Sequence, residues 1–223
     1  MGPPVVLFGL ARSVYTRIAR LALEEKGVPY TLESVEIFGP TGVPPEHLRR
    51  HPFGRIPAFT HGDFSLFETA AICRYVDEAF SGPALQPPAA SSRARMAQLI
   101  ALLDSYAYRP MVWGVFVQRL RLPLQGGVAD EALISTSLKQ ARTALVAIAA
   151  LMDDSAFLVG PALSLADLHA YPMLKCFSLA PEGAAAIAEH PRVATWMSGL
   201  AKRLSVQHTL TPYEQSSPGA CAA

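Results

Sequence analysis

This chain of 223 residues has few cysteines and almost no net charge, and each of these features excludes a class of protein. The three cysteines, Cys73, Cys176 and Cys221, are too few for a disulfide framework, and none lies in a C-x-x-C motif or a Cys/His cluster. There are 19 Lys and Arg against 18 Asp and Glu, so the net charge is +1. Proteins that bind nucleic acid or an anionic membrane usually carry an excess of basic residues, and this chain has almost none. We therefore expect reduced thiols, no metal site, no nucleic acid and no membrane.

Long apolar runs are missing as well. The strongest run, residues 145–152, is far shorter than the ~20 apolar residues of a membrane span. The first residues show no basic segment followed by the apolar core of a signal peptide. Hydrophobic residues nevertheless make up 51% of the chain, which excludes a disordered protein and supplies a core. We expect a soluble, cytoplasmic protein with one small domain and one larger one.

The first 82 residues predict an α/β domain that begins with a βαβ unit. Residues 5–8 are a short apolar run between proline and glycine, which is typical of a buried strand. Apolar residues then recur at helical spacing from residue 14 to 22, and Gly27 follows as a stop signal. Residues 30–35 predict a second strand, and the connecting helix favours a parallel pair.

The second half of this domain predicts a hairpin and a helix. Residues 38–56 are rich in Gly and Pro and predict an irregular segment. Residues 58–60 and 64–67 flank a His-Gly-Asp turn, as in a short antiparallel hairpin. Thr69 can cap the helix that follows, whose apolar stripe runs to Ala79. The order β-α-β and then β-β-α predicts a mixed sheet of four strands.

The rest of the chain predicts only helices. Residues 83–92, rich in Pro and Ser, predict a linker between residues 1–82 and an all-α domain over residues 93–210. Pro110 and Pro172 are expected to kink or end their helices. The small and polar residues 211–223 predict a mobile tail. Helical spacing runs over residues 93–122, 130–152, 165–179 and 193–204.

Ser13, between the first strand and the first helix, has two interpretations. Its oxygen can cap the helix by accepting a backbone N–H, which is the commonest role of serine at this position. Alternatively, its hydroxyl donates to an anion at the helix N-terminus, where the helix dipole and the free N–H groups favour negative charge. One serine before a helix does not decide between the two.

Two further pairs of residues have both a structural and a functional interpretation. Pro57 can simply start an edge strand, or a cis Ile56–Pro57 bond can turn the Ile56 backbone toward an extended peptide. Glu68 and Thr69 can be an ordinary helix start, or they can bind the ammonium and the carboxylate of a zwitterionic amino-acid end.

The segment Ser164-Leu165-Ala166-Asp167 matches a capping box, with Asp in place of the commoner Glu. An apolar helical pattern follows it directly. We assign this segment to folding and not to catalysis.

These motifs, in this order and at this spacing, resemble the soluble glutathione transferases over nearly the whole chain. The residues that carry the resemblance are residues 7–17, 52–57, 64–69 and 164–167. The resemblance implies a thioredoxin-like N-terminal domain, an all-helical C-terminal domain, glutathione as co-substrate and a homodimer. Residues 13–17 look most like the serine-type phi and theta enzymes and their bacterial relatives. No cysteine lies there, so the cysteine-dependent thiol-transfer classes are not favoured.

The resemblance also implies roles for individual residues. Ser13 matches the serine that activates the glutathione thiol, and Ile56 with Pro57 matches the pair whose backbone holds the cysteinyl part. Glu68 and Thr69 match the Glu-Ser pair at the γ-glutamyl end. Arg55 stands where many relatives have Gln or Lys, and is expected to meet a glutathione carboxylate.

The sequence departs from the family pattern in two places. His51 replaces the usual Asn of Asn-Pro-Phe-Gly. Phi enzymes carry a His-Lys pair that binds the glycyl carboxylate, whereas Gly42 and Val43 stand at the aligned positions here. The resemblance therefore implies that the glycyl end is held by Arg55 or is held poorly.

A second site, for a hydrophobic electrophile, is expected between the domains, where ligand pockets often lie. For the aromatic residues among its candidates, ordinary core packing is the alternative. Two other functions stay open, namely a binding module without chemistry and a glutathione-dependent isomerase or dehalogenase. Polar residues that could orient the electrophile are Tyr108, Arg109 and Arg119. The candidate lining residues are Leu10, Ala11, Tyr106, Met111, Trp113 and Phe116.

Overall fold

The computed structural model describes residues 2–215, which divide into two compact units. The first unit contains residues 2–84 together with residues 204–215, and the second contains Leu85–Arg203. The sequence boundary at residue 210 therefore differs from the structural one. Helix α10 (Leu204–His208) belongs with the first unit, because the Ser205 hydroxyl donates to Glu25 there and Val206 is buried.

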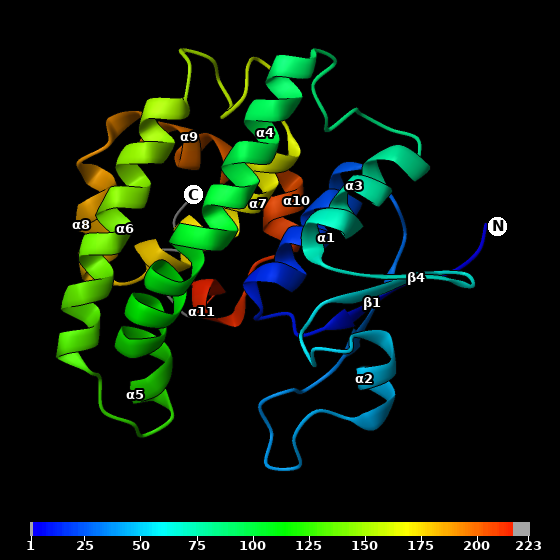
Figure 1. Cartoon of the computed structure of the whole chain (residues 1–223), viewed down its shortest axis with the longest axis horizontal. Helices are drawn as coiled ribbons and strands as arrows, with labels where there is room; N and C mark the ends of the chain where they lie inside the picture. Colours follow the sequence, from blue (N-terminus) through cyan, green and yellow to red (C-terminus); the bar gives the residue numbers. More distant parts are fainter. Residues whose placement is uncertain (1, 216–223) are drawn as a thin grey trace. The chain divides into compact units, whose positions relative to one another are not determined.

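A mixed four-stranded sheet forms the centre of the first unit, as the sequence predicts (Figure 1). Its strand order is β2-β1-β3-β4. The β1–β2 pair is parallel, and the other two pairs are antiparallel. Phe8 lies opposite Ala58, so the end of β1 is beside the start of β3. The strands are β1 (Val5–Gly9), β2 (Thr31–Ser34), β3 (Ala58–His61) and β4 (Phe64–Phe67).

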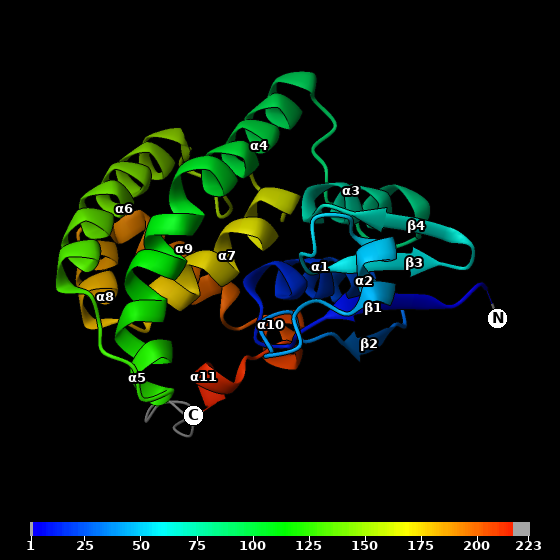
Figure 2. The same ribbon diagram turned by 60° about the horizontal axis from the view of Figure 1, so that its bottom comes forward.

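Three helices flank this sheet. Helices α1 (Val14–Glu25) and α3 (Thr69–Ala79) cover one face, and α2 (Pro45–Arg50) lies on the other (Figures 1 and 2). Gly27 follows α1 with φ +64°, a left-handed conformation that favours glycine and confirms the predicted stop. Helix α2 lies inside the segment predicted to be irregular. Proline is favourable at the first helical position, so Pro45 begins this helix instead of preventing one.

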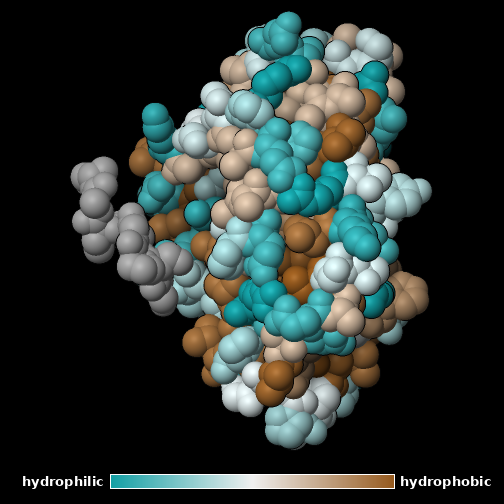
Figure 3. All heavy atoms as spheres, turned by 90° about the vertical axis from the view of Figure 1, so that its left-hand side faces the viewer, coloured by the Kyte–Doolittle hydropathy of each residue, from teal (hydrophilic) through white to brown (hydrophobic). Residues whose placement is uncertain are grey.

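The second unit is helical, as predicted. Helix α7 (Leu165–Ser178) is almost entirely buried and lies among the other helices of the unit (Figure 2). On the face shown in Figure 3, small groups of hydrophobic side chains lie among hydrophilic ones, as on a solvent-facing surface. The other elements are α4 (Ala90–Leu102), η1 (Leu103–Ala107), η2 (Arg109–Arg121), α5 (Leu122–Leu124), α6 (Glu131–Leu151), α8 (Pro181–Ala188) and α9 (Pro191–Leu200).

Two prolines and the predicted linker lie in helical segments that the sequence did not predict there. Pro172 lies inside α7, and the helix continues past it. Pro110 is near the start of η2, a segment wound as a π-helix with i→i+5 hydrogen bonds, such as Leu122 N–H to Val117 C=O. Helix α4 already begins at Ala90, inside the predicted linker.

No helix of residues 2–215 is both long and apolar enough to cross a membrane.

The predicted mobile tail, residues 211–223, is described only as far as residue 215. Residues 216–223 lie outside the described part of the chain. Residues before them form α11 (Pro212–Gln215), with Thr211 and Glu214 buried. Residues 211–215 differ from the expected tail, because Glu214 bonds to the buried Arg17 and the Thr211 hydroxyl donates to Glu214.

Candidate active site

Ser13 is the N-cap of α1. Its φ and ψ are −76° and 131°, and its Oγ accepts a hydrogen bond from the Thr16 N–H at 3.3 Å. Its carbonyl accepts a second bond, from the Arg17 N–H, at 2.9 Å. The capping interpretation is therefore confirmed. A hydroxyl that accepts through a lone pair still has its hydrogen to donate, so capping and donation to an anion are compatible.

Gly9 allows the strand β1 to pass closely beside the first turn of α1. A Cβ at this position would lie 2.4 Å from Thr16 Oγ1. Thr16 is fully buried and cannot easily move away. The close approach keeps the loop between β1 and α1 short, and this loop determines where Ser13 lies.

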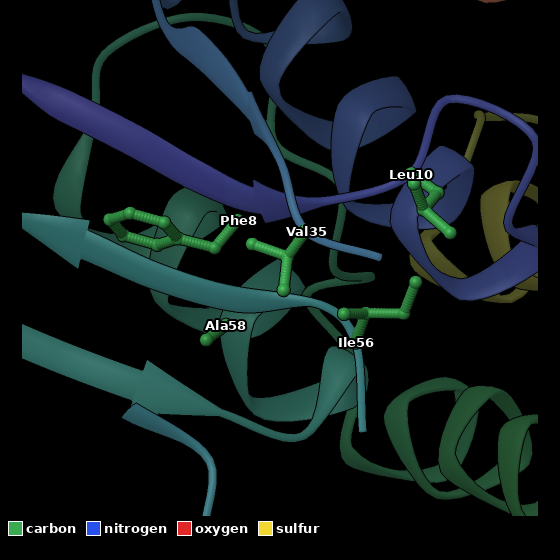
Figure 4. Close-up of a cluster of buried hydrophobic side chains, with 5 residues drawn as sticks. All are labelled: Phe8, Leu10, Val35, Ile56 and Ala58. Carbon is green, nitrogen blue, oxygen red and sulfur yellow. The ribbon is translucent and has the colours of Figure 1, made fainter. Parts of the chain in front are cut away.

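Ile56 is anchored at the end of the sheet near this loop. The Ile56–Pro57 peptide bond is cis. The Ile56 side chain packs in a buried cluster whose members come from the ends of β1 and β3 and from the segment after β2 (Figure 4). Its backbone N–H and C=O bond to no other residue that the structure describes. The other cluster members are Phe8, Leu10, Val35 and Ala58.

Glu68 has a strained backbone at the start of α3. Its φ and ψ are 70° and 113°, a conformation that residues with a Cβ rarely adopt. Thr69 was predicted to cap α3, but the N-cap position is Glu68, whose side chain makes no capping bond. Thr69 is instead the first helical residue and is buried, whereas Glu68 is exposed. Strain of this kind occurs often at functional sites.

The strain at Glu68 gives a test of stability. We expect Glu68→Gly to raise the free energy of unfolding by about 1 kcal/mol, because glycine removes a cost of roughly 1–3 kcal/mol and adds about 1 kcal/mol of chain entropy. Urea unfolding measures the change. The control is Ala71→Gly in the same helix, which we expect to lower stability by about 1 kcal/mol. A loss of stability in both variants would contradict the assigned strain.

Two histidines of the region are buried, and Arg55 is exposed beside them. The His47 Nε2–H donates to the Arg55 carbonyl at 2.7 Å. His51 packs on Phe67, with ring centroids 4.8 Å apart. Burial lowers the pKa of His51, which keeps it neutral at pH 7. His51 thus contributes packing and no cation, while the Arg55 guanidinium has no ion-pair partner among the described residues.

The candidate electrophile residues fall into two groups. Met111 and Phe116 are buried within η2, and Leu10 is buried in the cluster of Ile56. Ala11 is exposed, as are Tyr106 and Trp113, at 69% and 37% of their surface. The burial of Met111 and Phe116 agrees with ordinary core packing. A pocket formed by all six residues stays a prediction.

Two of the three polar candidates on the same segment, Tyr108 and Arg119, already have partners. The Trp113 Nε1–H donates to the Tyr108 hydroxyl at 3.0 Å. Arg119 bridges Glu131 and Glu182, with N–O distances of 2.5 and 2.6 Å. Arg119 therefore fastens η2 to α6 and α8.

The nucleophilic and metal-binding groups outside this region are few. Cys73 and Cys176 are buried and take part in no disulfide among residues 2–215, and Cys221 lies outside the described residues. Within residues 2–215, no group of three or more His, Cys, Asp or Glu side chains is placed to hold a metal ion.

Two models of protein domains match most of the chain. A model of the glutathione S-transferase N-terminal domain matches residues 3–78, and a model of the C-terminal domain of the same proteins matches residues 96–203. The chain belongs to the glutathione S-transferase family. Like the members it resembles, it is a transferase enzyme.

Individual glutathione transferases are similar over nearly the whole length. Glutathione S-transferase 1 of Zea mays is 31% identical over 92% of this chain and 94% of its own. A solved structure of glutathione S-transferase I from maize, in complex with an atrazine glutathione conjugate, is 32% identical, with a TM-score of 0.78. It is matched over 92% of this chain and 96% of its own. Another structure, of a glutathione S-transferase I bound with lactoylglutathione, is 30% identical over 92% of this chain and 98% of its own, with a TM-score of 0.81.

Proposed function

We propose that this glutathione transferase activates the glutathione thiol through Ser13 and conjugates the sulfur to a hydrophobic electrophile. The observation that carries the proposal is the Ser13 hydroxyl at the N-terminus of α1. Its oxygen accepts the Thr16 N–H, and its hydrogen has no acceptor among the described residues. A thiolate placed there receives both this hydrogen bond and the favourable end of the helix dipole.

The tripeptide would be held along the edge of the first unit. The unpaired N–H and C=O of Ile56 support a strand-like pairing with the cysteinyl residue, as an extended peptide adds to a sheet edge. The exposed Glu68 carboxylate supplies a partner for the γ-glutamyl ammonium. Thr69, at the start of α3, supplies a hydroxyl and a helix N-terminus for the γ-glutamyl carboxylate.

One hydrogen bond and the helix N-terminus supply enough free energy to ionise the glutathione thiol at pH 7, without a metal or a general base. A free thiol with pKa near 8.5 is only ~3% ionised at pH 7. Lowering the pKa to about 6.5 requires ~2.7 kcal/mol of preferential thiolate stabilisation. A charge-assisted hydrogen bond supplies roughly 1.5–3 kcal/mol, and the helix N-terminus adds about 0.3–1 kcal/mol.

We base the proposed substrate class of this chain on a ligand that a similar protein binds. The maize enzyme holds a conjugate of glutathione with atrazine. For this chain we propose conjugation of hydrophobic electrophiles in detoxification, in the cytoplasm and as a homodimer. Sedimentation of the purified protein tests the dimer.

Calorimetry tests the proposed binding directly. We expect glutathione to bind the purified chain below millimolar concentration, and a model aryl halide to be turned over faster than in solution with glutathione alone. Absence of binding heat at millimolar glutathione, in protein shown to be folded, would contradict the proposal.

Arg55 is the proposed partner of the glycyl carboxylate. We expect Arg55→Ala to weaken glutathione binding about five-fold, because an exposed ion pair is worth about 1 kcal/mol. The matched ligand is γ-glutamylcysteine, which lacks glycine and should bind the variant and the wild type equally. Calorimetry of both proteins with both ligands separates the effects. An equal loss for the two ligands would assign Arg55 to another part of the tripeptide.

A further inference from the structure

A buried ion pair joins helix α1 to the C-terminal helix α11. Arg17 Nη1 lies 2.6 Å from Glu214 Oε2, although the two residues are 197 positions apart in the sequence. The residues expose 0% and 5% of their surface. Burying a guanidinium is costly unless it is paired and hydrogen-bonded, so this pair requires a well-formed setting.

The C-terminal segment supplies that setting. The Thr211 N–H and hydroxyl donate to the same Glu214 oxygen, at 2.9 and 2.7 Å. The Arg17 Nε–H donates to Thr209 Oγ1 at 3.4 Å. Residues 209–214 therefore fix one carboxylate oxygen of Glu214 and accept two hydrogen bonds from the Arg17 guanidinium.

Arg17 is one helical turn beyond Ser13, and the backbone links the two directly. The Arg17 N–H donates to the Ser13 carbonyl at 2.9 Å. An anchored Arg17 side chain thus holds the first turn of α1, including the cap residue. A second contact, from the Ser205 hydroxyl of α10 to Glu25, lies at the opposite end of α1.

We propose that Glu214 is a positioning residue for thiol activation, acting through Arg17 on the placement of the Ser13 hydroxyl. The inference rests on the proposed function of Ser13. It makes the C-terminal segment part of the active-site machinery, although the segment follows the whole helical unit in the sequence. Because a hydrogen bond weakens steeply as its geometry degrades, a small movement of the first turn is sufficient to weaken donation to the thiolate.

The experiment titrates the thiol of bound glutathione by thiolate absorbance, in full-length protein well below its unfolding temperature. We expect Glu214→Ala to raise the thiol pKa by about one unit, which from a pKa of about 6.5 is roughly a three-fold loss of thiolate at pH 7. The matched control is Ser205→Ala, which breaks the contact at the far end of α1. We expect it to lower the melting temperature and to leave the thiol pKa unchanged.

Glu214→Gln distinguishes a positioning role of Glu214 from a direct effect of its charge on the thiol pKa. It also replaces Glu214→Ala as the test if that variant does not fold. Glutamine keeps an oxygen for Arg17 and Thr211, so the thiol pKa should stay within a few tenths of a unit of wild type. If the pKa falls in the Gln variant, Glu214 acts through its charge, and the proposal is overturned. An unchanged pKa in Glu214→Ala, alongside a raised pKa in Ser13→Ala, overturns this inference alone. An unchanged pKa in Ser13→Ala overturns the proposed function as well.

Discussion

Replacing Ser13 by alanine is expected to raise the thiol pKa of bound glutathione by about one to two units, because one charge-assisted hydrogen bond is lost. With a wild-type pKa of about 6.5, the fraction of thiolate at pH 7 then falls by roughly three- to twenty-five-fold. We expect kcat to fall by a similar factor near pH 7. Raising the pH should restore most of the lost rate, since the thiol then ionises without the serine.

The pH profile of kcat and the thiolate absorbance of bound glutathione measure this effect. Ser13→Ala also removes a helix cap, which costs about 1 kcal/mol of stability. Asp130→Ala is the matched control, because Asp130 caps α6 by accepting the Leu133 N–H at 2.9 Å. It should lose similar stability without any change in thiol pKa. A pH profile of Ser13→Ala identical to that of wild type would remove Ser13 from the mechanism.

Asp167→Asn is expected to reduce the free energy of unfolding by about 3–5 kcal/mol. Asp167 is fully buried at the start of α7, and each of its two oxygens accepts two hydrogen bonds. Oδ1 accepts from the Leu158 N–H and the Trp196 Nε1–H, both at 2.8 Å. Oδ2 accepts from the Ser164 N–H and hydroxyl, at 2.8 and 2.7 Å. In asparagine an NH₂ group replaces one oxygen and faces two donors.

Urea unfolding of wild type and variant measures this loss. The control is Asp153→Asn, where an exposed carboxylate accepts one N–H, from Ser155, at 2.9 Å. We expect that change to cost less than about 1 kcal/mol. The thiol pKa of bound glutathione should be the same in folded Asp167→Asn as in wild type, because the carboxylate serves folding. A loss as small as that of the control would contradict the role of the four bonds.

Local sequence patterns predicted most of the fold. The apolar run at β1, the helical stripe of α1 and the hairpin of β3 and β4 each depend on neighbouring residues, so their signals are contained in short windows. The capping box at Ser164 is local in the same way and is confirmed. Helix α2 was missed because it has only six residues, among glycines and prolines.

The site could be predicted only in part. A cap at Ser13 is a local property and was among the interpretations. The unpaired Ile56 backbone depends on how β1 and β3 meet, and the strain at Glu68 depends on how β4 leads into α3. No short window contains either feature, so residue types alone left the alternatives open.

The sequence by itself determined the strands, most of the helices and the position of Ser13 at a helix start, because caps and apolar periodicity are interactions among near neighbours. Only the tertiary structure decided that residues 204–215 join the first unit. The reason is that a buried charge must find its partner in space. Arg17 finds Glu214 across 197 positions, and no pattern in the intervening sequence records that contact.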